Sequence, residues 1–373
     1  MAIHTETEGI IGEPERKFLR GQSEAEVQRL REAATKLAAA VTWLPDRKST
    51  ESLSIRCEKL VQQFKSMAEA VEPAFQQNPS SADLLELRTS AILLTSGAKN
   101  VCNELGGASL PVVSSKAEIV PRVIAIAQTF VAQVDATFTQ KQFSAFCLTF
   151  EELVPLQFHE IGSLVPALKL ILLERIAESG SELLRHPTDS TLRVIPLVKA
   201  YQQVLQASWR EELESLIPFE EILRKDPVGA FARMDLESRN SYRERVAQIA
   251  RRSDQTEIEV ARHALALARQ AQKRQYRDQR IAERESHIGY YLVGDGVTVL
   301  CQRVAYHPTF GERVRKALRS HPDEFLLVGI AFLTLVVVTS VLWLLTPSDT
   351  PLQIVLLSML ICCCQVPKQQ YSS

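Results

Sequence analysis

The sequence has few of the residues that favour sheets and tight turns. Only 14 of its 373 residues are glycine and 6% are aromatic, whereas long stretches are rich in Ala, Leu, Glu, Gln and Arg. This composition favours helices over strands. The 43 basic and 44 acidic residues nearly cancel. No net field of the whole chain would therefore attract nucleic acid or an anionic membrane.

The sequence also lacks the patterns of several kinds of site. Its seven cysteines form no C-x-x-C pair, and four of them stand singly, as is typical of reduced thiols: Cys57, Cys102, Cys147 and Cys301. The histidines form no H-E-x-x-H pattern, so no metal site is expected. No D-x-D element occurs, although nucleotide-sugar transferases use one to hold a divalent ion. We therefore expect no catalytic, cofactor-binding or metal-ligating residue in this chain.

Two ends of the chain differ in character from the rest. Residues 1–20 lack the apolar core of a secretory signal, and we expect a disordered cytoplasmic tail there. Residues 325–345 carry no charge, and at about 1.5 Å per residue such a helix spans a hydrocarbon core of about 30 Å. The sequence therefore predicts a transmembrane helix at 325–345, with the lipid bilayer as a partner.

The charges beside this span predict its orientation. Four basic residues precede the span: Arg313, Arg315, Lys316 and Arg319. The loop that follows it carries a single charged residue, Asp349. The positive-inside rule keeps the residues before 325 in the cytoplasm. A second apolar segment, 352–366, is shorter and is similar to the start of a returning helix.

Most of the remaining chain reads as a helical body, 21–225. Apolar residues recur at helical spacing in the segments 22–44 and 52–75. These residues are Val27, Leu30, Ala34, Leu37 and Val41, followed by Leu53, Cys57, Leu60, Phe64, Met67 and Val71. The stretch 120–184 is more apolar still and predicts internal helices. Stacked helix pairs are the expected arrangement.

Residues 226–286 predict a helical pair followed by a basic juxtamembrane helix. Asp235 can cap the first helix, and Asp254 with Glu257 gives the second a start like a capping box. The pair resembles a helix-turn-helix, which would suggest DNA binding. Acidic residues at the start of the second helix would repel DNA, so no nucleic acid is expected as a partner.

Residues 287–324 predict a hairpin and a linker. Gly294 and Gly296 lie between two segments rich in aromatic and β-branched residues, and we expect them to turn a small β-hairpin near 287–304. The expected fold class is thus all-α. It comprises a multi-helix cytoplasmic body, this small hairpin, and one or two transmembrane helices.

Four ordered motifs carry a family resemblance: Asp226 to Arg243, Ala250 to Ser253, Glu259 to Ala264 and His287 to Leu292. Together they resemble the N-terminal region of cyclic β-1,2-glucan synthases, over roughly residues 80 to 364. These are large bacterial inner-membrane proteins that join a glycosyltransferase domain to a glycoside-phosphorylase-like domain.

The resemblance implies a role and a location. It implies a non-catalytic fragment that serves glucan synthesis as helical scaffold and membrane anchor, at the bacterial inner membrane. In the intact protein the transferase and phosphorylase-like domains would be its partners. The UDP-glucose donor and a divalent metal would bind in the transferase domain, because this chain lacks the D-x-D and Q-x-x-R-W elements.

Eight residues within these motifs are the candidates for a specific role: Arg233, Asp235, Arg239, Tyr242, Arg243, His287, Tyr290 and Tyr291. Helix capping and packing are the expected functions of these residues, ahead of substrate contact. Two other interpretations of the whole chain remain open. One is a stand-alone membrane-tethered module that binds another protein, and the other is a membrane-linked DNA-binding protein.

The final residues depart from the family pattern. Related proteins continue from the second apolar run into a Leu-Leu-Pro-x-Ser stretch, and a shifted reading of plausible codons for this tail yields Leu-Leu-Pro-Ser-Ser-Lys. We therefore expect residues 362–373 to be the product of a frameshift, and the fragment to be truncated for that reason. The codons of the gene test this expectation.

Overall fold

The computed structural model describes most of the chain before residue 310 and a few residues after it. The described residues are 13–40, 42–48, 50–106, 110–115, 118–134, 136, 138–186, 193–275, 277–309, 311, 329, 330, 332–334, 336, 337 and 340. The chain divides into two units, 1–306 and 307–373. The described part is mostly helical, as the composition predicts.

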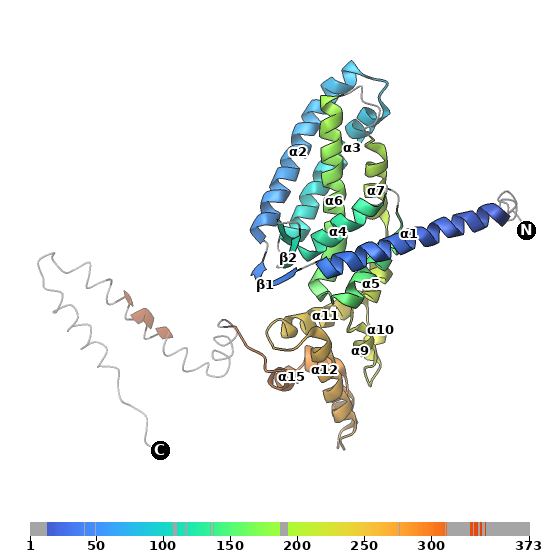
Figure 1. Ribbon diagram of the computed structural model, residues 1–373. Coiled ribbons are helices and arrows are strands. Elements are labelled where there is room, and N and C mark those ends of the chain that lie inside the picture. The colour runs from blue at the N-terminus through green and yellow to red at the C-terminus, as the bar shows by residue number, and fades with distance from the viewer. Residues whose placement is uncertain are drawn as a thin grey trace, which may run out of the picture. The chain divides into compact units, whose positions relative to one another are not determined.

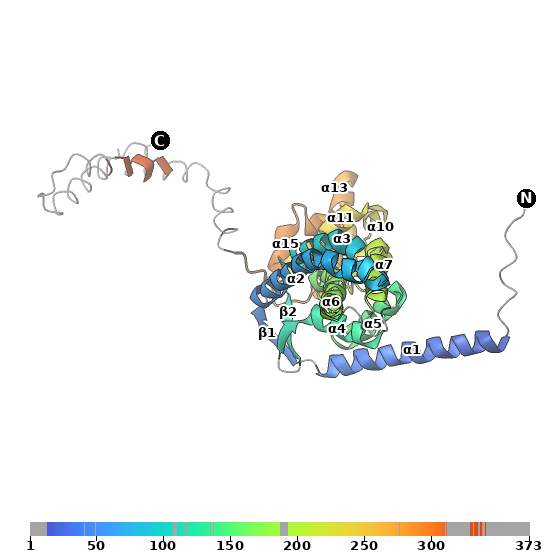
Figure 2. The same cartoon turned by 90° about the horizontal axis from the view of Figure 1, so that it is seen from above.

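Three long helices pack side by side in the first unit (Figure 1): α2 (Thr50–Gln77), α3 (Ala82–Gly106) and α6 (Phe158–Arg185). Helix α6 is central, because it also contacts α4 (Arg122–Gln133) and α7 (Ile195–Gln206), as the view along the bundle in Figure 2 shows. Its fully buried side chains include Leu164, Leu168, Leu170, Leu172, Leu173 and Ile176. Burial of this much apolar surface is the main stabilising term for the bundle.

Helices α1 (Glu13–Ala40) and α5 (Gln140–Leu153) pack against each other. Helix α1 begins at Glu13, earlier than the expected boundary at residue 20, and residues 1–12 lie outside the described residues. Helix α5 begins at a capping box in which Thr139 and Gln142 satisfy each other's backbone N–H groups. Two N–H groups without helical partners are thereby satisfied.

The predicted apolar stripes are confirmed except at Val27, which is only half-buried, and at Val41, which lies outside the described residues. The buried members are Leu30, Ala34, Leu37, Leu53, Cys57, Leu60, Phe64, Met67 and Val71. The apolar side chains of α4 are buried as well, among them Val123, Ile126, Phe130 and Val131. Helical periodicity was therefore sufficient to identify which face of these helices packs into the core.

The structure contains a small sheet that the sequence reasoning does not predict. Strands β1 (Thr42–Lys48), β2 (Pro111–Ser115) and β3 (Glu118–Pro121) pair antiparallel in the order β1-β2-β3. Trp43 lies opposite Val113, and Val113 lies opposite Val120. The β-branched and aromatic residues fit paired strands, but β1 and β2 are far apart in sequence, so no local pattern indicates their pairing.

Shorter helices complete the first unit: α8 (Arg210–Ser215), α9 (Glu220–Arg224), α10 (Ala230–Arg233), α11 (Leu236–Ala250), α12 (Glu257–Gln272), α13 (Gln279–Glu285), α14 (Ile288–Leu292) and α15 (Val297–Arg303). Asp235 caps α11 as predicted, since its carboxylate accepts from Ser238 N at 2.7 Å. The capping box of α12 is formed by Thr256 and Glu259, not by the predicted pair Asp254 and Glu257.

The predicted β-hairpin near 287–304 is wrong, because helices α14 and α15 occupy this segment. Ile288, Tyr291 and Leu292 follow helical spacing and are buried against α12. Gly294 and Gly296 do make a tight turn. A Cβ at Gly296 would lie 2.6 Å from the Tyr290 ring, so the turn folds back over α14 and does not connect two strands.

The second unit holds the predicted membrane segments, most of which lie outside the described residues. Within 325–345, residues 329, 330, 332–334, 336, 337 and 340 are described and helical. The second apolar segment, 352–366, and the tail 362–373 lie entirely outside. Among the described residues, no helix has the length and hydropathy needed to cross a bilayer.

Candidate functional site

The Asp226 carboxylate accepts hydrogen bonds from the first backbone N–H groups of two helices, α10 and α14. It lies between α9 and α10, with its side chain fully buried. One carboxylate oxygen accepts from Ala230 N at 3.0 Å and from His287 Nδ1 at 2.9 Å, and the other accepts from Ile288 N at 2.9 Å. The carboxylate therefore holds the N-termini of α10 and α14 in place, where negative charge is favourable.

His287 links this carboxylate to Tyr242 on α11. The Tyr242 hydroxyl lies 3.1 Å from His287 Nε2. In the tautomer whose Nδ1–H donates to Asp226, the lone pair lies on Nε2, and the Tyr242 hydroxyl donates to it. Asp226, Tyr242 and His287, hereafter the Asp226 cluster, thus form one hydrogen-bonded chain joining three elements.

The electrostatics of the Asp226 cluster favour a charged acid and a neutral phenol. Burial acts to raise the pKa of Asp226, but hydrogen bonds from His287 and from the backbone of Ile288 outweigh it, so the pKa is lowered. Burial and the nearby Asp226 charge raise the pKa of Tyr242. A raised pKa opposes ionisation, so the cluster suits the role of a hydrogen-bonded brace better than that of an activated nucleophile.

A second group of motif residues surrounds Arg243 on α11. The Arg243 side chain is 2% exposed, and its Nε donates to Glu220 Oε2 at 2.9 Å. Its Nη2 lies 3.3 Å from Glu214 Oε1, and Arg239 Nη1 lies 3.5 Å from Glu214 Oε2. We call Glu214, Glu220, Arg239 and Arg243 the Arg243 cluster. It fastens α11 to α8 and α9 through buried, paired charges.

The other predicted residues lie apart from these clusters' hydrogen bonds. Arg233 is exposed and donates to the carbonyls of Val228 and Gly229, closing the turn before α10. Tyr290 packs edge-on to Tyr291 at 5.1 Å between ring centroids and lies beneath the Arg284 guanidinium. The structure therefore brings Tyr242 to His287 and places Arg239 and Arg243 beside the same carboxylate, Glu214. Asp235 caps α11, and Arg233 bonds only to nearby carbonyls.

Sequence reasoning missed the acidic partners of these residues. Asp226 begins one of the motifs, but nothing local indicates that it meets His287, 61 residues later. Glu214 and Glu220 lie outside the motifs. A further buried pair, Arg122 and Glu160, was also missed: Arg122 Nε donates to Glu160 Oε1 at 2.8 Å. A buried Arg in an apolar segment is itself the signal, since such a charge requires a partner.

A cleft of about 660 Å³ lies beside the Arg122–Glu160 pair. It is lined by the segment before α6 and by the loop between α11 and α12, including Leu156, Arg251 and Glu257. Glu257 accepts from Phe158 N at 3.0 Å across the two elements. Burial raises the pKa of Glu257 to about 7, although this hydrogen bond lowers it, and the charge of Glu160 raises it further. This hydrogen bond links the first turn of α12 to the start of α6.

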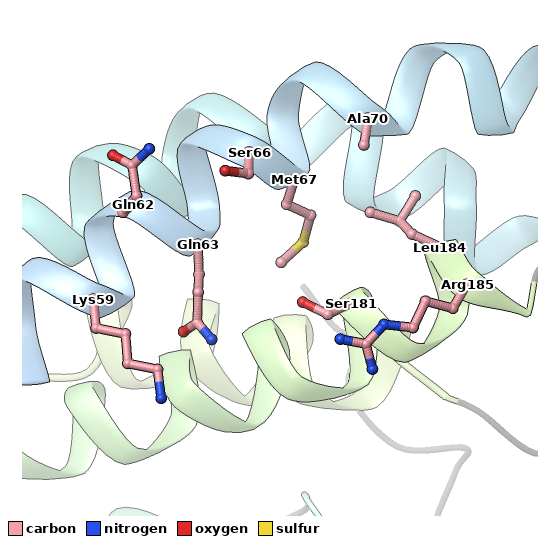
Figure 3. A pocket seen from close by; sticks show the side chains of 9 residues that line it. All are labelled: Lys59, Gln62, Gln63, Ser66, Met67, Ala70, Ser181, Leu184 and Arg185. Atoms are coloured by element: carbon pink, nitrogen blue, oxygen red, sulfur yellow. The ribbon is translucent and has the colours of Figure 1, made fainter.

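A shallower cleft of about 450 Å³ lies between α2 and α6. Figure 3 shows Gln63 and Met67 of α2 facing Ser181 and Arg185 of α6 across this groove. None of the eight predicted residues lines either cleft. Of the eight, Arg239, Tyr242, Arg243 and His287 make contacts between helices.

Comparison with known proteins gives one distant similarity. No protein-family model matches the chain. The chain is 26% identical over 156 residues to the cyclic beta-(1,2)-glucan synthase NdvB of Rhizobium meliloti (strain 1021), and the match covers 42% of this chain. The matched stretch spans only 5% of the synthase. Together with the ordered motifs, this identity supports a distant relationship between this chain and cyclic β-(1,2)-glucan synthase.

Proposed function

We propose that this chain is a non-catalytic scaffold module of a bacterial glycosyltransferase that makes β-1,2-linked glucan. The observation that carries the proposal is the similarity to the cyclic beta-(1,2)-glucan synthase over 156 residues. In this account the helical body is cytoplasmic, residues 325–345 anchor it in the inner membrane, and the transferase and phosphorylase-like domains are its partners. UDP-glucose and the divalent metal bind to the transferase domain.

The geometry supports a scaffold through the nature of its joints. Four of the motif residues, Arg239, Tyr242, Arg243 and His287, make contacts between α8, α9, α11 and the start of α14. When a buried ion pair loses one partner, the protein is strongly destabilised, because the other charge stays buried without compensation. Such pairs therefore hold helices in a defined arrangement. A rigid body of this kind can fix the position of a neighbouring catalytic domain, because small displacements of reacting groups lower rates substantially.

A segment exchange tests the proposal. The part of the Rhizobium meliloti synthase that matches this chain is replaced in frame by the corresponding residues of this chain, and glucose transfer from UDP-glucose into glucan is measured in membranes. We expect the exchanged synthase to retain activity and a synthase with that segment deleted to lose it. Full activity of the deleted form would contradict the proposal.

A second arm tests the absence of catalysis. The full chain, expressed alone in the same membranes, is supplied with UDP-glucose and a divalent metal. We expect neither UDP release nor glucan above the background of membranes without the chain. Transfer of glucose by the chain alone would show that it carries its own catalytic site.

A further inference from the structure

Two cysteine thiols meet between neighbouring helices, outside the sites described above. Cys57 lies near the start of α2 and Cys102 near the end of α3, and the two helices run side by side (Figure 1). Both thiols are free, and both line the same cleft between the two helices. A disulfide requires side chains that approach closely, and the shared cleft brings these two to the same place on α2 and α3.

Both thiols are reached from one cleft. They line a cavity of about 730 Å³ together with Val61, Lys65 and Lys99. Cys102 is partly exposed and Cys57 is 5% exposed. Only a small oxidant can therefore contact the sulfur of Cys57 through this opening.

The two thiols differ in reactivity. The hydrogen bond from Cys102 lowers the pKa of Cys57, against the effects of burial and the Glu174 charge, while the Arg56 charge lowers it further. The same hydrogen bond and burial raise the pKa of Cys102. Because the thiolate is the nucleophile, Cys57 is the attacking thiol and Cys102 the resolving thiol.

We propose that Cys57 and Cys102 form a reversible redox pair that hydrogen peroxide converts into a disulfide linking α2 to α3. The Cys57 thiolate attacks one peroxide oxygen, the O–O bond breaks, and hydroxide leaves and takes up the Cys57 proton as water. Cys102 then loses its proton, and its sulfur attacks the Cys57 sulfenic acid. The S–O bond breaks and the second oxygen leaves as water, so two thiols are oxidised and one peroxide is reduced.

The link has a mechanical consequence for the bundle. It closes the chain between 57 and 102 and thereby restricts the unfolded state. The oxidised protein should melt several degrees above the reduced protein, and a thiol reductant should reverse the shift. In cytoplasmic proteins such disulfides are typically transient and redox-sensing.

Peptide mapping of the full chain tests the pair. The protein is treated with hydrogen peroxide, remaining thiols are blocked, and the tryptic peptides 57–59 and 100–116 are examined by mass spectrometry. We expect these two peptides to be joined, with a mass about 2 Da below their sum because two hydrogens are lost. Separate blocked peptides, or links from either to Cys362, Cys363 or Cys364, would overturn the proposal.

The variant Cys102→Ser separates the two thiols' roles. It should form no link, show no upward shift in melting temperature, and accumulate a sulfenic acid that dimedone traps on Cys57. Circular dichroism confirms that it is folded. A dimedone adduct on Cys147 in place of Cys57 would contradict the proposal, because Cys147 is fully buried and its burial raises its pKa. Cys147 thus serves as the internal control within the same sample.

Discussion

Arg243 is a buried cation between two carboxylates, and its neighbours determine the effect of removing it. We expect Arg243→Met to lower the free energy of unfolding by about 3 kcal/mol, because Glu220 would remain buried without its main partner. Arg224, 3.2 Å from Glu220, offsets part of the loss. Denaturant titration measures the change.

The matched control for this prediction is Arg233→Met. Arg233 has the same side chain and lies in the same motif, but it is exposed and bonds only to local carbonyls. Its substitution should change the free energy of unfolding by less than about 0.5 kcal/mol. An equal decrease in the free energy of unfolding for the two variants would show that the buried ion pair stabilises the protein no more than the exposed arginine does.

We expect the contribution of Asp226 to the free energy of unfolding to depend on pH. Its folded-state pKa lies below its ordinary value of 3.8. The carboxylate therefore contributes stability that is present above about pH 4 and is lost as the pH falls through the lowered pKa. Asp226→Asn should lower the free energy of unfolding by about 2 kcal/mol at pH 7.

Unfolding at several pH values checks the sign for Asp226. The difference between the wild type and Asp226→Asn should shrink as the pH falls below about 4, because the unfolded-state carboxyl is protonated first and the folded-state carboxyl loses its charge once the pH reaches its lowered pKa. A difference that grows toward acid pH would rule out a charged Asp226 in the folded protein.

At the scale of elements, α14 can approach α11 closely because Gly289 has no side chain at their contact. A Cβ at Gly289 would lie 2.1 Å from the Tyr242 hydroxyl. Gly289→Ala should destabilise the protein by about 2 kcal/mol through overpacking. Adding Tyr242→Phe removes the clashing oxygen and should recover part of the loss. A double-mutant cycle from thermal unfolding measures this coupling, and strictly additive losses would contradict the close approach.

Glu257 joins α12 to α6 and predicts the opposite pH dependence from Asp226. Its folded-state pKa of about 7 lies above its ordinary value of 4.5, so folding favours the uncharged form. Its contribution to stability is full below about pH 4.5 and declines as the pH rises through 7.

The variant Glu257→Gln should therefore be more stable than the wild type at pH 8, by up to about 3 kcal/mol, and nearly equal to it at pH 4.5. Melting curves across this range measure the difference. Glu237→Gln removes an exposed carboxyl of α11 and controls for the change in net charge. A constant offset between Glu257→Gln and the wild type at all pH values would contradict the raised pKa.

The elements also show what sequence reasoning can predict. The stripes on α1, α2 and α4 were predicted because a helix repeats its buried face every three to four residues. The segment 287–304 was assigned as strands because its aromatic and β-branched residues favour them locally. Packing of Ile288 and Leu292 against α12 overrode that preference. The sheet was missed because β1 and β2 pair across two intervening helices.

At the scale of the whole molecule, the candidate site could be predicted only in part. The motifs identified Tyr242, Arg243 and His287, and the structure places all three at joints between helices. Their partners Glu214, Glu220 and Asp226 come from other segments, so only the folded chain brings them together. Contacts between residues from distant segments have no regular separation in the sequence, so a search for patterns cannot detect them.

In the proposed function, these contacts between helices support catalysis in another domain and take no part in it themselves. The most direct measurement is glucose transfer from UDP-glucose by a synthase in which the exchanged segment is chosen to include residues 226–304 of this chain and carries Tyr242→Phe. The Asp226–His287 hydrogen bond remains in this variant, so the account predicts a rate and a KM for UDP-glucose within about twofold of the unsubstituted exchange. A loss of about a hundredfold in a variant that is still folded would contradict the account and would place Tyr242 in the chemistry.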